Sequence, residues 1–426
     1  MRLLDNHKIQ FYIFKMYLPR LLASTFRNAV REFPAVLLTG PRQSGKTTFL
    51  LHEMGGRAGY ATFDDPAERR FAIMDPNGFL DRFAGKAAIL DEIQYVPELL
   101  PYIKMRIDAD RRAAGRWLLT GSQQFHLMKN IVESLAGRVA ILELLPFSIL
   151  ETGARKGKLG SVLWNGGYPE PSLYPHKRNL WVRSYIRTYV ERDVRQLQNI
   201  RDLRSFELFL GLCAANHGKA FNTAGLSRDC GVSLPTIKAW GSVLEASYLI
   251  HLLPPYFRNF GKRVVKTPKL FFLDSSIACD LTRQPDPDSA LAGPMGGPLF
   301  EGWIVGEAVK VYTMLGKKPD LFFWRSHDGL EVDVIVQAGP VLHPVEVKLT
   351  ATPSDKHVEP MERFRALAGP DKVGTGILVC RTTKEIPLPG GHRAIPWDRF
   401  ASWLKTTLDP PAAASTAPAP RPRQEA

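Results

Sequence analysis

A glycine-rich stretch near the start of the chain has the residue types needed to bind phosphate. It reads GPRQSGKTT and follows the apolar run AVLLT at residues 35–39. Glycines let backbone N–H groups close around an anion, the Lys46 ammonium neutralises phosphate oxygens, and the Thr47 hydroxyl is a ligand for magnesium. The spacing therefore predicts a site for ATP with Mg²⁺. The expected contacts are Gly40, Pro41, Arg42, Gln43, Ser44, Gly45, Lys46, Thr47 and Thr48.

An acidic pair follows a second apolar run, in AAILDEIQ at residues 87–94. A nucleotide-bound metal needs a carboxylate at the end of a neighbouring buried strand, and Asp91 supplies one. Glu92 is then placed to polarise the water that attacks the γ-phosphate. The pair predicts that the bound ATP is also hydrolysed.

Two further polar positions are weaker candidates for catalysis. RWLLTGSQQF places Thr120 and Ser122 at the tip of a third strand, where a polar group can sense the γ-phosphate, although Gly121 is equally compatible with a plain turn. Arg138, in ESLAGR, is a candidate arginine finger toward developing phosphate charge, within one chain or between chains of an oligomer. The alternative for Arg138 is a solvated surface group.

The elements that position these residues alternate between strand and helix, which predicts a parallel α/β sheet. An amphipathic helix is expected at residues 18–31, before the first strand. The pattern is helical from about residue 171 to 253. A helix over 300–315 and the strands LFFWRS, LEVDVIVQ and LHPVEVKL predict a second α/β unit toward the C-terminus.

Carboxylates gather on the last two of these strands. If Gly339-Pro340 is a two-residue hairpin turn, antiparallel pairing sets Asp333 across from Glu346 and Glu331 across from Lys348. Strict alternation puts one set of side chains on each face. The first face is expected to carry Val332, Val334 and Val336, and the second Glu331, Asp333 and Ile335.

Facing carboxylates repel, so this arrangement implies a cation, a shared proton or a distorted ladder. A metal between Asp333 and Glu346, with Lys348 beside the scissile phosphate, is the site of D…E-x-K nucleases, and Glu307 matches their additional acid on a helix. Val332 stands where some of these nucleases have proline. The alternatives are a nuclease-like scaffold that does not cut, or a hairpin with a structural Glu331–Lys348 pair.

The middle segment has the rhythm of a helix-turn-helix. In FNTAGLSRDCGVSLPTIKAWGSVLEASYLI, at residues 221–250, a turn at 231–233 separates two helices, with Thr236, Lys238 and Ser242 facing outward. The basic run that follows predicts a wing able to bind duplex DNA, although a winged helix can also serve as a lid on an ATPase. The basic residues of the expected wing are Arg258, Lys262, Arg263, Lys266 and Lys269.

The motifs LLTGPRQSGKTT, ILDEIQ, LLTGSQQ, ESLAGR, GGYPEP and YVERDVR occur in this order along the chain. Together they resemble a family of bacterial and archaeal AAA-type ATPases whose C-terminal domain, of unknown function, is similar to a restriction-endonuclease fold. The resemblance runs from about residue 17 to 404. It implies an α/β fold: an AAA-type P-loop NTPase core with a parallel sheet, a helical winged-helix segment, and a C-terminal α/β restriction-endonuclease-like domain.

The expected segments follow from these patterns. They are an N-terminal extension at 1–16, with Met16 as an alternative start, the ATPase core at 17–150, a helical lid or linker at 151–205, a winged-helix-like domain at 206–285, a restriction-endonuclease-like domain at 293–404, and a disordered tail rich in proline and alanine at 409–426.

The composition limits the classes of binding partner that the chain is expected to have. A net charge of +14 over 426 residues favours an acidic partner such as nucleic acid, DNA more than RNA, or an anionic membrane surface. The most apolar run, at residues 9–22, is too short and too charged to span a bilayer, so no membrane partner is expected. The four cysteines form no C-x-x-C pair, which fits a reducing cytoplasm. A nucleotide-timed switch or scaffold with a protein partner remains the alternative function.

Overall fold

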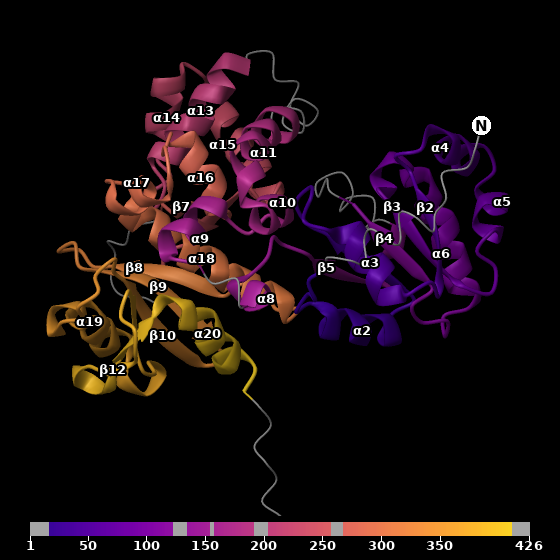
Figure 1. The fold of residues 1–426 in the computed structure, drawn as a ribbon. Coiled ribbons are helices and arrows are strands. Elements are labelled where there is room, and N and C mark those ends of the chain that lie inside the picture. The colour runs from indigo at the N-terminus through magenta and orange to yellow at the C-terminus, as the bar shows by residue number, and fades with distance from the viewer. Residues whose placement is uncertain (1–16, 122–133, 154–156, 191–202, 257–266, 411–426) are drawn as a thin grey trace, which may run out of the picture.

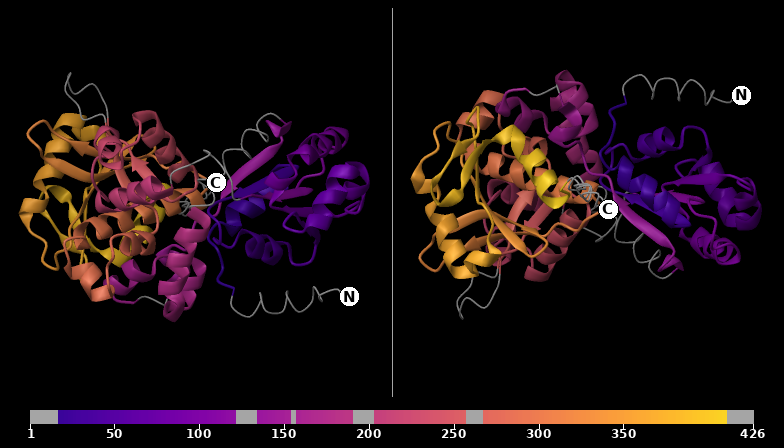
Figure 2. Two further views of the ribbon diagram at one scale, coloured as in Figure 1. Left: turned by 90° about the horizontal axis from the view of Figure 1, so that it is seen from above. Right: turned by 90° about the horizontal axis from the view of Figure 1, so that it is seen from below.

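The computed structural model of the chain has two lobes (Figures 1 and 2). It describes residues 17–121, 134–153, 157–190, 203–256 and 267–410. The first lobe holds the chain up to about residue 143, and the second holds the rest. The expected N-terminal extension at 1–16 and nearly all of the expected tail lie outside the described residues.

A parallel sheet forms the centre of the first lobe, in the order β2-β3-β4-β1-β5, and every neighbouring pair is parallel. This confirms the parallel α/β core expected from the sequence. The strands at 35–39, 87–91 and 117–120 were anticipated, whereas those at 58–62 and 139–143 were not, because their residues are only partly buried. The strands are β1 (Ala35–Thr39), β2 (Ala58–Thr62), β3 (Ala87–Asp91), β4 (Trp117–Thr120) and β5 (Val139–Glu143).

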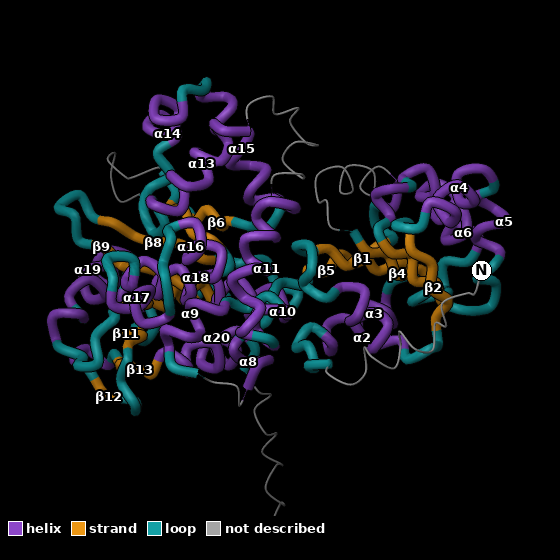
Figure 3. Tube along the Cα trace, turned by 45° about the horizontal axis from the view of Figure 1, so that its top comes forward, coloured by secondary structure: helices purple, strands orange, loops and turns teal. Residues whose placement is uncertain are grey.

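Helices cover both faces of this sheet, as Figure 3 shows. Alternate residues of β1 point to opposite faces, with Ala35 and Leu37 in one apolar cluster and Val36 and Leu38 in the other. A strand buried on both faces reads as a continuous apolar run, which is why AVLLT was recognisable. The helices are α2 (Ala23–Glu32), α3 (Lys46–Met54), α4 (Pro66–Met74), α5 (Pro76–Asp81) and α6 (Leu100–Ala109).

The second lobe begins with helices. The turn predicted at 231–233 is present, with Gly231 at φ 66° between two helices and Ser233 capping the second. The elements are α8 (Ile149–Thr152), α9 (Leu159–Asn165), α10 (Pro169–Leu173), α11 (Arg178–Tyr185), α13 (Leu203–Ala215), α14 (Thr223–Cys230), α15 (Leu234–Ala246), β6 (Ile250–Leu253), β7 (Lys269–Phe272), α16 (Ser275–Leu281) and α17 (Pro287–Ala292).

Strands β6 and β7 form an antiparallel pair after these helices. The residues that would form the tip of a wing, 257–266, lie outside the described part of the chain. Lys269 was expected on a basic wing surface, but this is wrong. It is buried at the start of β7, because its ammonium is paired with acidic side chains of the C-terminal unit.

The C-terminal unit is a six-stranded sheet in the order β12-β13-β11-β10-β9-β8. The predicted hairpin is present: Ala338 pairs with Val341 across Gly339-Pro340. The elements are α18 (Gly296–Met314), β8 (Leu321–Arg325), β9 (Glu331–Ala338), β10 (Val341–Val347), α19 (Glu359–Ala368), β11 (Ile377–Cys380), β12 (Ile386–Pro387), β13 (Arg393–Pro396) and α20 (Phe400–Leu408).

One predicted face of β9 is interrupted. Val334 and Val336 pack in the main core as expected, but Val332 packs in a different cluster, together with Ile335. The ladder between β8 and β9 shifts register between Phe322 and Trp324. A bulge adds one residue to a strand and so reverses the alternation beyond it, which accounts for the error.

One large apolar cluster runs through the whole second lobe, beside two smaller ones that lie wholly or mainly in the C-terminal unit. It includes Phe209 and Trp240 of the helical segment, Phe300 of α18, and Val345 of β10. The segments expected as lid, winged-helix-like and nuclease-like domains therefore share one core. Among the described residues, no helix is long and apolar enough to cross a membrane, and all four cysteines are buried and free of disulfides.

His217 makes this shared core sensitive to acid. Its ring is buried, accepts the Phe272 N–H at Nδ1 (3.1 Å), and has its pKa lowered by burial from 6.5 to about 4. Between these values the unfolded chain binds a proton that the folded chain does not, so stability falls as pH drops from 7 toward 4, by up to about 3 kcal/mol from this group. Urea unfolding at pH 7 and pH 5 checks this. His217→Gln should reduce the difference, and the remainder includes His251, whose pKa burial also lowers to about 4; an unchanged pH dependence in that variant would contradict the assignment.

Candidate functional site

The residues expected to contact phosphate, 40–48, form the loop between β1 and α3 and the first turn of α3. Gly40 has φ 138°, and a Cβ there would lie 2.3 Å from the Leu144 carbonyl oxygen. Gly45 has φ 93° and precedes the first residue of α3. Glycine is therefore required at both positions by the backbone itself, and the helix N-terminus faces the space that an anion would occupy.

The Lys46 ammonium is buried in this loop. Its Nζ donates to the carbonyl oxygens of Gly40 (3.1 Å) and Pro41 (2.9 Å). These carbonyls hold the amine directly over the loop. Phosphate oxygens of a bound nucleotide would offer the same ammonium a charged partner in place of neutral ones.

Asp91 lies at the end of β3 and collects hydroxyl groups from three other elements. Its carboxylate accepts hydrogen bonds from Thr47 Oγ1 (2.9 and 3.0 Å), from the Tyr60 hydroxyl (3.1 Å) and from Thr120 Oγ1. Burial raises the pKa of this carboxyl above its usual value. A carboxylate next to a threonine hydroxyl is the oxygen donor set that Mg²⁺ prefers, so Thr47 and Asp91 fit the expected metal.

Glu92 occupies a constrained position beside this carboxylate. Its backbone is left-handed, with φ 57°, and its N–H donates to Thr120 Oγ1 (3.1 Å). Its carboxylate accepts a hydrogen bond from Gln94 Nε2. A left-handed conformation in a non-glycine residue persists only where surrounding contacts hold it, which is common at functional sites.

One of the weaker candidates, Ser122, lies outside the described residues, so its place relative to the site stays a prediction. Another, Arg138, does not join the site. Arg138 directly precedes β5, and its backbone carbonyl accepts a hydrogen bond from the N–H of Ala35, the first residue of β1. Arg138 therefore lies at the start of these strands, whereas the phosphate loop follows the end of β1. The Arg138 guanidinium is bound to Asp108 through two bonds of 2.8 and 3.1 Å. Arg138 therefore does not reach the phosphate loop of its own chain.

A buried arginine, Arg20, hydrogen-bonds the phosphate loop, although no sequence motif indicated it. Arg20 donates to the Ser44 carbonyl (3.0 Å), to the Leu145 carbonyl (2.5 Å) and to Glu151 Oε1 (2.9 Å). Glu151 also accepts the Ser148 N–H (2.9 Å), closing the first turn of α8. The phosphate loop is thus connected through charged groups to the junction between the lobes.

Tyr248 makes a second connection to the end of β1. Its hydroxyl donates to Glu143 (3.0 Å) and lies 3.0 Å from the Thr39 hydroxyl, one residue before the phosphate loop. Tyr248 itself has φ 58°, between α15 and β6. No sequence pattern predicted the contact between Tyr248 and Thr39, because the two residues are more than two hundred positions apart.

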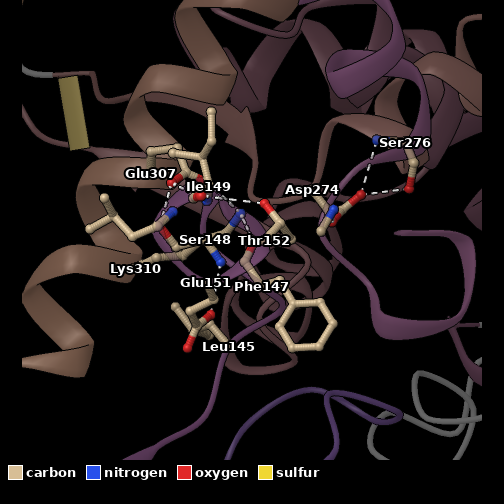
Figure 4. A network of polar contacts seen from close by, with 12 residues as sticks. Leu145, Phe147, Ser148, Ile149, Glu151, Thr152, Asp274, Ser276, Glu307 and Lys310 are labelled. Carbon is tan, nitrogen blue, oxygen red and sulfur yellow. Dashed lines mark hydrogen bonds and ion pairs between the residues drawn. The ribbon is translucent and has the colours of Figure 1, made fainter. Parts of the chain in front are cut away.

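Glu307 was expected to be the helical acid of the nuclease-like site, and the structure contradicts this. Its carboxylate accepts Ser148 Oγ (2.6 Å), the Ile149 N–H (3.0 Å) and Lys310 Nζ (2.9 Å), as Figure 4 shows. These three bonds engage the Glu307 carboxylate where α18 meets the start of α8. It therefore joins α18 to the start of α8 within the second lobe instead of facing the strands of the C-terminal sheet.

Asp333, Glu346 and Lys348 do come together. Lys348 Nζ lies 2.7 Å from Asp333 Oδ2 and 2.7 Å from Glu346 Oε2. Glu346 is 1% exposed, and its Oε1 has no hydrogen-bond partner among the described residues. Burial and the neighbouring Asp333 charge raise the pKa of Glu346 well above its usual value. Oxygen donors and an unsatisfied buried carboxylate oxygen fit a divalent cation at this position.

The helical acid beside these strands is Glu301, two turns before Glu307. Oxygens of Glu301, Glu331 and Asp333 all lie within 4.8 Å of one another. Lys269 of β7 enters this group and pairs with Glu301 (2.8 Å) and Glu331. Burial raises the pKa of Glu301 to about 7. Burial opposes the charged form of Lys269, but the charges of Glu301, Glu331 and Asp333 raise its pKa above the usual value.

Three family models match the chain. Residues 32–153 match an AAA domain, residues 156–288 match a Domain of unknown function (DUF8612), and residues 296–400 match a second Domain of unknown function (DUF4143). The first match covers the phosphate loop, Asp91 and Glu92. It identifies the first lobe as an AAA-type P-loop ATPase fold.

Curated relatives cover most of the chain. The proteins Rv2008c of Mycobacterium tuberculosis and Mb2031c of Mycobacterium bovis, both described as uncharacterized, are each 32% identical over 338 residues, which is 78% of this chain and 74% of theirs. The uncharacterized protein MJ1544 of Methanocaldococcus jannaschii is 24% identical over 277 residues, 56% of this chain and 60% of that protein.

Solved structures resemble the chain more distantly. The Walker-type ATPase PABY2304 of Pyrococcus abyssi has 16% identity and a TM-score of 0.43, covering 62% of this chain and 96% of that one. The RuvB Holliday junction branch migration motor of Thermotoga maritima has 18% identity and a TM-score of 0.28, covering 59% of this chain and 90% of that one.

Proposed function

Because the chain belongs to the family of the mycobacterial proteins Rv2008c and Mb2031c and has an AAA-type P-loop ATPase core, we propose that it is a Mg²⁺-dependent ATPase acting on DNA. The observation that carries the ATPase is the contact between Thr47 and Asp91. It joins the helix after the phosphate loop to the end of β3, with the Lys46 ammonium in the same loop.

The residues have distinct parts in hydrolysis. Lys46 moves from the Gly40 and Pro41 carbonyls to the β and γ oxygens of ATP, where it offsets their charge. Thr47 and Asp91 would hold a magnesium ion, which would supply positive charge against the transferring phosphate. Glu92 accepts the proton of the attacking water, with Thr120 and Gln94 fixing the position of its backbone and side chain.

The action on DNA rests on charge and on the helices of the middle segment. The chain carries a net charge of +14, and Lys238 and Ser242 are exposed on α15, the second helix after the turn at Gly231. An exposed helix in a basic chain suits the major groove, in the manner of a winged helix. In the C-terminal unit we propose that Asp333 and Glu346 bind a divalent cation, with Lys348 facing a nucleic-acid phosphate.

A second candidate is a nucleotide-timed switch or scaffold that binds a protein partner and does not cut. The observation that favours it is the Lys269 ammonium, which pairs with Glu301 and Glu331 beside Asp333. A cluster neutralised by an internal lysine can be retained for structure alone. In that case the ATPase cycle would be the only chemistry.

The two candidates differ in how ATP hydrolysis responds to nucleic acid. We expect duplex DNA to raise the ATPase rate several-fold, and the effect to decline steeply with rising salt, because phosphate contacts release counterions. Single-stranded DNA and RNA of equal length are the comparisons. A rate unaffected by any of these at low salt would reject the action on DNA and leave the switch as the better candidate.

A further inference from the structure

The acidic cluster of the C-terminal unit is larger than a single metal site requires. Among the described residues it brings together the carboxylates of Glu301, Glu331, Asp333 and Glu346. In the described part of the chain, the ammonium groups of Lys269 and Lys348 lie against them, and the Arg325 guanidinium lies 3.6 Å from Glu331 on the exposed side. The formal balance of these groups is one negative charge, which a buried cluster cannot hold without a proton or a further cation.

The cluster has two halves that meet at Asp333. In one half, Asp333 and Glu346 share the Lys348 ammonium, and the buried Glu346 Oε1 lacks a hydrogen-bond donor among the described residues. In the other half, Glu301, Glu331 and Asp333 offer oxygens within 4.8 Å of one another. The second spacing would suit a cation coordinated by all three.

The Lys269 ammonium lies among the carboxylates of the second half, although Lys269 belongs to the middle segment of the chain and not to the C-terminal unit. It lies on β7, opposite Leu253 of β6, and its Nζ is 2.8 Å from Glu301 Oε1 and in contact with Glu331. Its side chain is 9% exposed, so the ammonium is held without bulk water around it. The carboxylates of Glu301 and Glu331 thus already bind a positively charged group, and that group belongs to the chain itself.

We propose that Lys269 is a built-in competitor for a divalent cation. The Asp333–Glu346 half takes one metal ion when the Lys348 ammonium, on a side chain that is 39% exposed, turns outward. Lys269, whose side chain is 9% exposed, keeps a second ion out of the half formed by Glu301, Glu331 and Asp333. Movement of the Lys269 side chain out of the cluster would open the second position, so this residue of the middle segment controls how many metal ions the cluster holds. This regulation rests on the proposed cation site of the C-terminal unit, and it is independent of ATP hydrolysis.

Mn²⁺ binding to the nucleotide-free full chain tests the proposal, by titration calorimetry or by electron paramagnetic resonance of the free ion. The unaltered chain should bind one Mn²⁺ at the cluster, and this ion should be lost in Glu346→Gln. Lys269→Met should bind a second Mn²⁺, at least about ten-fold more tightly than the unaltered chain binds it, because a neighbouring positive charge is gone. Lys269→Arg keeps the charge and should stay at one ion.

Equal stoichiometry and affinity in Lys269→Met and the unaltered chain would overturn the proposal. If the unaltered chain binds no Mn²⁺ and Lys269→Met binds one, the competition holds and the proposed metal site at Asp333 and Glu346 fails. Should Lys269→Met not fold, judged by its circular dichroism melt, acetylation of the unaltered chain decides. Saturating Mn²⁺ should raise labelling of Lys269 several-fold and leave the exposed Lys238 unchanged, and constant labelling of Lys269 would reject the idea.

Discussion

Lys46→Ala is expected to abolish ATP binding at millimolar nucleotide. The ammonium is buried among loop carbonyls and faces the position of the β and γ phosphates. Loss of one positive charge about 4 Å from a phosphate removes about 4 kcal/mol at an effective dielectric near 20, or roughly a thousand-fold in affinity. Equilibrium binding of a fluorescent ATP analogue measures this directly.

Glu92→Gln separates binding from turnover at the same site. It keeps the size of the side chain but removes the proton acceptor, so affinity for ATP should change little while kcat falls by about 10² or more. The matched control is Lys86→Ala, an exposed lysine of the same lobe, which should behave as the unaltered chain. Hydrolysis at an unaltered rate by both Lys46→Ala and Glu92→Gln would refute the assignment of this site.

Arg20→Met should destabilise the first lobe by about 3 kcal/mol. The arginine is 7% exposed, and its removal leaves buried Glu151 without its ion-pair partner and the Ser44 and Leu145 carbonyls without donors. Breaking a buried pair from one side costs far more than breaking an exposed one. Urea denaturation monitored by tryptophan fluorescence gives the change in free energy.

An exposed pair provides the control for Arg20. Arg27 lies 3.2 Å from Glu53, but its side chain is 59% exposed, so Arg27→Met should cost less than about 1 kcal/mol. The double variant Arg20→Met, Glu151→Met should recover part of the loss, since no buried charge then remains unpaired. Equal effects of Arg20→Met and Arg27→Met would show that the buried network does not stabilise the loop.

Local patterns in the sequence predicted the position of the phosphate loop and its contact with Asp91. The phosphate loop needs particular residues at fixed spacing, and Asp91 at the end of β3, two strands away from β1, meets it because parallel strands end at the same edge of the sheet. The closeness of Asp333 and Glu346 was also predictable, since a two-residue turn fixes the register of a hairpin, and the ladder runs in that register as far as Val334 and Val345. In the hairpin one short segment determines the geometry, and at the phosphate loop the regular parallel sheet does.

Contacts between distant segments could not be predicted. Glu301 and Glu307 lie on the same helix, and the sequence does not say which turn of it faces the strands, so the wrong acid was chosen. Lys269 read as a surface charge in a basic run, because its acidic partners come from another part of the chain. Arg20 carries no motif, and its role depends on packing between α2, the loop and α8.

The largest apolar cluster of the second lobe, whose members lie between Leu145 and Leu408, also determines how the protein unfolds. The two family models, 156–288 and 296–400, divide this cluster between them, although two smaller clusters lie wholly or mainly in the C-terminal unit. Cooperative unfolding follows interiors, and not the boundaries of conserved segments. A fragment cut near residue 290 would expose half of that cluster to water, so the smallest autonomous piece of the second lobe is the whole of it.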